Sequence, residues 1–198
     1  MTSMAGIERP FSGNVIGGYG ENYRSPLITN APPVAATVPL HSVGTTPLTT
    51  VTATVHCASL NVNINQPISK LVTCVTTTGT VTGFWYALLD AGLIVRAVSA
   101  NVAATSAGYF SLSVLPASNV PYVATYSGLF YVAVGTVSSV AVQLSAQAAA
   151  PSVAAVSGPP IYCGTSATAA TTAPPIVGAQ LGALTGVASN QFLALAYA

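Results

Sequence analysis

The chain has 198 residues, which suits one domain with an appendage. Only 4% of its residues are charged, against about 25% in an ordinary soluble domain. Its four Lys and Arg residues are too few to form the basic surface that nucleic-acid binding requires, so nucleic acid is not expected as a partner. Three carboxylates and two histidines are also a thin inventory for catalysis, so we do not expect an enzyme.

A membrane span has to be considered, because 52% of the residues are hydrophobic and the mean hydropathy is +0.66. Residues 83–100 are the best candidate, but Asp90 and Arg96 interrupt them. Residues 128–156 are uncharged, yet Thr, Ser and Gln residues break the apolar run. Their Val, Thr and Tyr content favours strands over a spanning helix. We therefore expect no membrane partner.

Residues 1–50 differ from the rest of the chain. They contain four of the seven charged residues, six prolines and several glycines, and they show no long helical or strand periodicity. This composition predicts an extended N-terminal arm, partly polyproline-like, rather than a packed domain. Such an arm becomes ordered when it runs across a neighbouring protein. The chain is therefore divided into an anchoring arm, residues 1–50, and a β domain, residues 51–198.

From residue 51 the pattern is that of strands. Runs rich in β-branched and aromatic residues predict strands at 52–62, 70–76, 81–89, 93–98, 109–115, 129–134 and 140–144. A short Asp-Ala-Gly connection at residues 90–92 predicts a hairpin. Within 109–115, Phe110, Leu112 and Val114 alternate with serines, so one face is apolar. Strands at this spacing predict an all-β fold, a jelly-roll-like antiparallel β-sandwich.

The last fifty residues contain a long segment with a weak strand pattern and a final segment with a strong one. Residues 146–190 are rich in Ala, Thr, Pro and Gly, and we expect long ordered loops with a short strand at 161–163. A helix at 177–184 is an alternative that Gly178 and Gly182 weaken. The final segment, QFLALAYA at 191–198, predicts a strand that would promote aggregation unless it closes the sheet.

The N-terminus and the cysteines bear on where the protein is made. The sequence begins MTSMAGIERPF, without the basic and apolar regions of a secretory signal. The odd number of cysteines, namely Cys57, Cys74 and Cys163, indicates reduced thiols and synthesis in the cytoplasm. Cys57 and Cys74 lie on successive predicted strands and could face each other, but we favour buried free thiols.

A few polar residues invite a chemical interpretation. Asp90 lies at the predicted turn, where an Asp usually binds its own backbone instead of acting as an acid or nucleophile. His56 and Cys57 are neighbours on a strand, so their side chains point to opposite faces. The other histidine is His41, and zinc would need about four ligands at suitable spacing. Residues 16–20, Ile-Gly-Gly-Tyr-Gly, resemble a phosphate loop only superficially. No catalytic residue, cofactor or metal is expected.

Phe84, Trp85 and Tyr86 form the densest aromatic cluster of the sequence. On a strand, Phe84 and Tyr86 share one face and Trp85 takes the other. We favour packing in the core for these rings. The alternative is an aromatic platform for sugars, either here or at the aromatic residues of 122–131, Tyr131 among them.

Two segments carry a resemblance to a known family. Residues 83–100, GFWYALLDAGLIVRAVSA, and residues 126–134, YSGLFYVAV, resemble a β-sandwich module of tailed phages that infect actinobacteria. The pattern is an aromatic-Ala-Leu-Leu-Asp hairpin and then a Gly-Leu-aromatic-Tyr-Val strand. A Thr-, Pro- and Gly-rich stretch that ends in a strand follows, here residues 172–198. The resemblance covers about residues 51–198 and brings no catalytic or metal-binding residues.

This module occurs in minor tail proteins and other virion appendages. The resemblance implies a structural virion protein, made in the host cytoplasm, and we expect a minor tail protein whose residues 1–50 bind other virion proteins. A head decoration or head-fibre protein on the capsid lattice is the first alternative, and a module that binds host cell-wall glycans is the second. Because a nearly uncharged surface has little electrostatic protection against association, we expect a homo-oligomer and favour a trimer.

Overall fold

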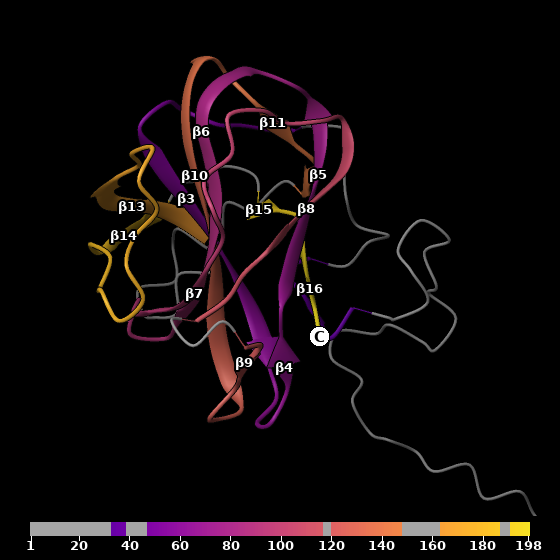
Figure 1. Cartoon of the computed structure of the whole chain (residues 1–198), viewed down its shortest axis with the longest axis vertical. Coiled ribbons are helices and arrows are strands. Elements are labelled where there is room, and N and C mark those ends of the chain that lie inside the picture. The colour runs from indigo at the N-terminus through magenta and orange to yellow at the C-terminus, as the bar shows by residue number, and fades with distance from the viewer. Residues whose placement is uncertain (1–32, 39–46, 117–119, 148–162, 187–190) are drawn as a thin grey trace, which may run out of the picture.

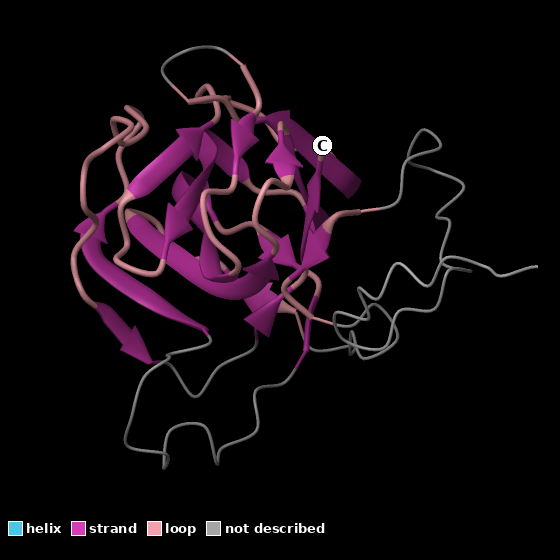
Figure 2. Cartoon of the chain, turned by 90° about the horizontal axis from the view of Figure 1, so that it is seen from below, coloured by secondary structure: helices cyan, strands magenta, loops and turns pink. Residues whose placement is uncertain are grey.

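The computed structural model describes residues 33–38, 47–116, 120–147, 163–186 and 191–198. In these ranges the regular secondary structure consists of strands alone, and every strand pair is antiparallel (Figure 1). Figure 2 shows the same strands from below, packed in two layers. The predicted all-β sandwich is confirmed.

Each layer is a six-stranded sheet. The first sheet contains β1 (Ala35–Ala36), β16 (Ala194–Tyr197), β5 (Lys70–Thr77), β11 (Gln143–Leu144), β2 (Leu48–Thr49) and β8 (Gly108–Ser113). The second sheet has the order β14 (Leu184–Gly186), β13 (Cys163–Ala169), β3 (Thr54–Val62), β10 (Gly128–Val140), β6 (Thr80–Asp90) and β7 (Val95–Val98). Two short ladders pair β12 (Ala146–Gln147) with β15 (Gln191–Phe192) and β4 (Pro67–Ile68) with β9 (Tyr122–Val123).

The chain passes repeatedly from one sheet to the other. It runs from β3 in the second sheet to β5 in the first, returns for the β6–β7 hairpin, and crosses again for β8. It then crosses for β10, β11, the β13–β14 pair and finally β16. Such alternation between two packed sheets is the connectivity expected of a jelly-roll-like sandwich.

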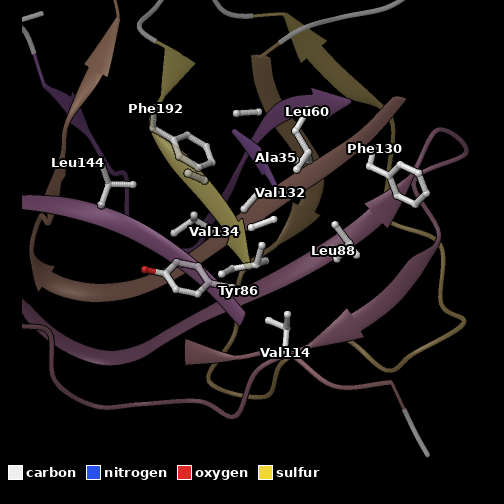
Figure 3. Packing of buried hydrophobic residues seen from close by; sticks show 14 of the residues in the cluster. Ala35, Leu60, Tyr86, Leu88, Val114, Phe130, Val132, Val134, Leu144 and Phe192 are labelled. Carbon is white, nitrogen blue, oxygen red and sulfur yellow. The ribbon is translucent and has the colours of Figure 1, made fainter. Parts of the chain in front are cut away.

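The main hydrophobic core lies between the two sheets (Figure 3). Phe84, Tyr86, Phe130, Leu144 and Phe192 are all at most 1% exposed. The ring of Phe84 meets those of Tyr86 and Phe110 edge-on, with centroids 5.3 and 5.5 Å apart. Burial of each such side chain contributes about 1.5–3 kcal/mol, so this layer supplies much of the stability.

A second core covers the outer face of the second sheet. It contains Trp85, Leu89 and Tyr131 from the sheet, together with Ala170 and Leu181 from the segment beyond β13. The second sheet is therefore buried on both faces. This explains why β6 is apolar in an unbroken run from residue 83 to residue 89 and shows no alternation of polar and apolar residues.

The C-terminal strand lies inside the first sheet. β16 pairs with β1 on one side and with β5 on the other, so neither of its edges is open. Ala194 and Ala196 contribute to the main core. Leu193, Leu195 and Tyr197 lie in a small apolar cluster with Val38 and Val72 on the other face. The expectation that this strand closes the sheet is confirmed.

The folded region begins earlier than the predicted boundary at residue 50. Ala35 and Ala36 of β1 pair with Ala196 and Leu195, and Leu48 of β2 pairs with Leu144. These strands have only two residues each, so they are too short to produce a periodic pattern in the sequence. Residues 1–32 and 39–46 of the predicted arm lie outside the described residues.

The segment after residue 140 also differs from the prediction. The alternative of a helix at 177–184 is wrong, because Gly178 is in a turn with φ +90° and β14 begins at Leu184. The short strand expected at 161–163 begins at Cys163 within the described residues and continues to Ala169. Its Ala, Thr and Ser residues have small side chains, so strand propensity alone gave a weak signal.

Trp85 packs directly over the backbone of Gly135. The two residues are paired across β6 and β10, and a Cβ on Gly135 would lie 2.1 Å from Cζ2 of the indole. The indole Nε1 also donates a hydrogen bond to the Thr171 carbonyl at 2.9 Å, which fixes the segment that covers the second core.

We expect Gly135→Ala to lower the free energy of unfolding by about 1–3 kcal/mol, because the added methyl overpacks this contact. Trp85→Ala should cost about 3–5 kcal/mol. In the double variant the alanine methyl occupies space that the indole has left. The double variant should therefore lose less free energy of unfolding than the two single variants lose in sum, as measured by urea denaturation. Strict additivity would contradict the contact.

Candidate functional site

The described residues contain three charged side chains, Lys70, Asp90 and Arg96. Asp90 is buried at the end of β6 and pairs with Arg96 on β7. One carboxylate oxygen, Oδ2, accepts hydrogen bonds from Nε and Nη2 of Arg96 at 2.9 and 2.5 Å. The only ion pair found in this part of the chain thus links the two strands of the hairpin.

The other oxygen of Asp90 holds the turn. Oδ1 accepts hydrogen bonds from the backbone N–H groups of Gly92 and Ile94, at 2.9 and 3.0 Å. Leu93 has φ +62°, an unusual conformation for a bulky residue, and its N–H bonds to the Asp90 carbonyl. One carboxylate oxygen of Asp90 thus holds the turn, as predicted, and the other binds Arg96 on β7.

Tyr126 anchors this hairpin to β10. Its hydroxyl accepts a hydrogen bond from the Ala91 N–H at 3.0 Å and donates one to the Leu129 carbonyl at 2.8 Å. Its ring stacks on Phe130, with centroids 4.6 Å apart. The aromatic and Asp-containing segments that suggested a family resemblance therefore meet in one structural unit.

His56 and Cys57 lie on opposite faces of β3. Cys57 belongs to the second core, where burial raises the pKa of its thiol to about 12. The Nε2 atom of His56 accepts a hydrogen bond from the Val51 N–H at 3.2 Å, and burial lowers the pKa of His56 to about 4. A protonated thiol and a neutral imidazole on different faces form no thiolate–imidazole pair, which confirms the structural interpretation.

The four aromatic residues singled out by the sequence are all buried. Phe84 and Tyr86 point into the main core, while Trp85 and Tyr131 lie in the second core. Their exposed fractions are 0, 0, 2 and 4%, respectively, so their rings offer no surface to a sugar. The Tyr86 hydroxyl lies 2.6 Å from Thr73 Oγ1 and donates to the Phe110 carbonyl, and burial raises its pKa. For these four residues the packing interpretation holds, whereas Tyr122 and Tyr126, the other tyrosines of 122–131, are only partly buried.

No disulfide links Cys57, Cys74 and Cys163. Cys57 and Cys163 are buried and Cys74 is half-buried. Cys57 lies in the second core and Cys74 packs against the cluster on the outer face of the first sheet, so these two do not face each other.

Within the described residues, no three His, Cys, Asp or Glu side chains are close enough together to bind a metal ion. In the same ranges no helix has the length and apolar character to cross a membrane. His41 and residues 16–20 lie outside the described residues.

One surface feature escaped the sequence interpretation, namely the free edge of β8. This strand pairs with β5 over residues 108–113 and with no other strand of the described structure. Ser111 and Ser113 are exposed. The alternation of the segment was visible in the sequence, but its position at an edge was not, because the order of strands depends on long-range pairing.

No protein-family model matches the chain, and neither the curated proteins nor the solved structures gave a significant match.

Removal of the Asp90 carboxylate should destabilise the hairpin. We expect Asp90→Ala to lower the free energy of unfolding by about 2–3 kcal/mol, because it leaves two turn N–H groups without their charged acceptor. Arg96→Met is the matched control and should cost less than about 1 kcal/mol, since its side chain is 41% exposed. Equal losses in urea denaturation would show that the ion pair, and not the turn, is the stabilising element.

His56 should make the protein sensitive to acid. Between pH 6.5 and about 4 the unfolded chain binds a proton at this imidazole and the folded chain does not. The free energy of unfolding should therefore fall by up to about 1.4 kcal/mol per pH unit as the pH decreases through this window. Below it both states are protonated, and the loss levels off.

The test compares urea denaturation of the wild type and of His56→Gln at pH 7 and pH 4.5. The glutamine retains an acceptor for the Val51 N–H but does not titrate, so its stability should fall less. Other acidic groups contribute equally to both proteins and cancel in the difference. The same loss in both would show that His56 does not titrate in this window.

Proposed function

We propose that this chain is a non-enzymatic structural protein of a tailed-phage particle, and specifically a minor tail protein. The observation that carries the proposal is the near absence of charge from a folded β-sandwich. Residues 97–198 contain no Asp, Glu, Lys or Arg, although they supply about half of both sheets. A surface of this kind favours association, and partners in an assembly would cover it.

The ionisable groups of the described structure support a role without catalysis. Asp90 and Arg96 are used by the hairpin, and His56 and Cys57 are buried on opposite faces of β3. These groups stabilise the fold and leave no pair in mutual reach to transfer a proton or attack a substrate. The family resemblance supports the same class of function.

In this proposal the N-terminal residues bind neighbouring virion proteins and the sandwich is the rigid unit that is displayed or packed. Strands β1 and β2 belong to the sandwich, so the anchoring segment is residues 1–32 and not the whole of 1–50. Copies associate as a homo-oligomer, for which a trimer is favoured, and the protein is located in the virion.

A head decoration or head-fibre protein is the second candidate, because the same charge-poor sandwich suits a capsid lattice. The two differ in position and in copy number. Four of the aromatic residues named for the glycan-binding alternative, Phe84, Trp85, Tyr86 and Tyr131, are buried, so no observation favours that function over these two.

The test is to locate the chain in purified particles by cryo-electron microscopy. A few copies at the tail tip or baseplate are expected, and hundreds of copies over the head would support the decoration protein instead. Absence from particles would contradict both. A variant that lacks residues 1–32 should fold, as judged by circular dichroism, but should not be incorporated; normal incorporation would contradict the anchoring role.

A further inference from the structure

One buried hydroxyl group in the middle of the second sheet has no hydrogen-bond partner among the described residues. It is Oγ1 of Thr136 on β10, and the residue is 0% exposed. A hydroxyl that is removed from water and left unpaired costs free energy. Nearly all buried polar groups in native proteins therefore have a partner, either another protein group or an ordered water molecule.

His56 on β3 supplies a second polar group of this kind. Its Nε2 accepts a hydrogen bond from the Val51 N–H at 3.2 Å. Burial lowers the pKa of His56 to about 4, so the imidazole is neutral at pH 7. A neutral imidazole has one acceptor nitrogen and one N–H, so Nδ1 of His56 carries the proton. Within the described residues this Nδ1–H group has no acceptor, although His56 is only 6% exposed.

These two groups lie diagonally across the β3–β10 pair. Thr136 is opposite Thr54, and His56 is opposite Val134. Paired residues, and residues two apart on one strand, share a face, so all four side chains point to the same side as Val134 does in Figure 3. Diagonal neighbours are about 7–8 Å apart at the backbone. Because Thr136 Oγ1 has no partner within hydrogen-bonding distance, it does not bond directly to His56.

The shared face changes from apolar to polar at the same level on both strands. Ala58 on β3 and Val132 and Val134 on β10 belong to the main core. The next positions on this face are His56 on β3 and Thr136 on β10, in each case toward the same end of the pair.

A further buried hydroxyl without a partner among the described residues lies two positions beyond Thr136, namely Oγ of Ser138. This end of the core is therefore polar at several positions and not at a single accidental one.

The chemistry of these groups limits what they can bind. The charged side chains of the described structure are Lys70, Asp90 and Arg96, and none of them is on β3 or β10. A neutral imidazole and hydroxyl groups offer no net charge to hold an ion. Water both donates and accepts hydrogen bonds, so it suits one N–H donor and neighbouring hydroxyls. Buried water molecules typically make about three hydrogen bonds to polar groups that are otherwise unsatisfied.

We propose that an internal water molecule bridges β3 and β10 at this position. It accepts a hydrogen bond from Nδ1–H of His56 and donates one to Oγ1 of Thr136, and the hydroxyl of Thr54 is its third partner. The bridge satisfies both buried groups. It also holds the imidazole in the orientation in which Nε2 receives the Val51 N–H. Residues 51–53, just before β3, are exposed, so water has a short path to this site.

A crystal structure of the full chain, at a resolution that orders water molecules, tests the site directly. We expect one water within hydrogen-bonding distance of both Nδ1 of His56 and Oγ1 of Thr136. A direct hydrogen bond between these two atoms, or a contact without water, would overturn the proposal.

The variant Thr136→Val tests the same site in solution, because valine has nearly the shape of threonine but no hydroxyl. A hydroxyl that is buried dry and unpaired destabilises the fold, so its removal would raise the urea midpoint. With the bridge in place, the substitution removes one hydrogen bond of the water, and the midpoint should fall. An unchanged or higher midpoint would contradict the bridge.

The matched control is Thr50→Val. Thr50 is 1% exposed, and its hydroxyl donates a hydrogen bond to the Val142 carbonyl at 3.0 Å. This variant should lower the midpoint whether or not the water is present, so it shows that the measurement registers the loss of one buried hydrogen bond.

Nuclear magnetic resonance supplies a readout that does not depend on stability. The ring nitrogen shifts of His56 should show the proton on Nδ1, and this proton should give a cross-peak with bound water that Thr136→Val abolishes. A proton on Nε2, or a cross-peak that persists in the variant, would overturn the proposal. None of these outcomes bears on where the chain lies in a particle, so failure of the water bridge is distinguishable from failure of the proposed function.

Discussion

The pairing of β6 with β10 lies at the centre of a sheet that has apolar side chains on both faces. Phe84 and Tyr86 project from β6 to one side and Trp85 to the other, so neither face tolerates water. The first sheet covers one face, and the segment from Ala170 to Leu181 covers the other. Both faces of this sheet have to be covered by other parts of the chain. This requirement explains why the chain crosses so often between the layers.

The same requirement restricts where charge is allowed. The few ionisable groups of the described structure occur where the fold uses them, as in the Asp90–Arg96 hairpin, or where they are neutralised by burial, as at His56. The exposed residues of β8 are uncharged as well. In the proposed structural role, strand edges and uncharged surface favour association with neighbouring chains.

Local patterns predicted the parts of the structure that depend on neighbours in the chain. Asp90 at a turn, the opposite directions of Trp85 and Tyr86, and the divergence of His56 from Cys57 all follow from strand geometry, which holds in any sheet. The two-residue strands β1 and β2 were missed because their residues form strands only through their partners. The helix considered near Val177 was wrong for a related reason, since a turn and contacts with β7 hold that segment.

The sequence by itself determined the all-β class, the near absence of charge, the hairpin at Asp90 and the strand at the C-terminus, because each depends on composition or on a period of two residues. Only the tertiary structure decided which strand lies at an edge, that Tyr131 is a core residue, and that the folded unit begins before residue 50. These properties depend on hydrogen bonds and contacts between residues far apart in the chain, as in the pairing of Ala35 with Ala196. Pairing over such a distance is settled only when the apolar faces of the whole sheet are buried together.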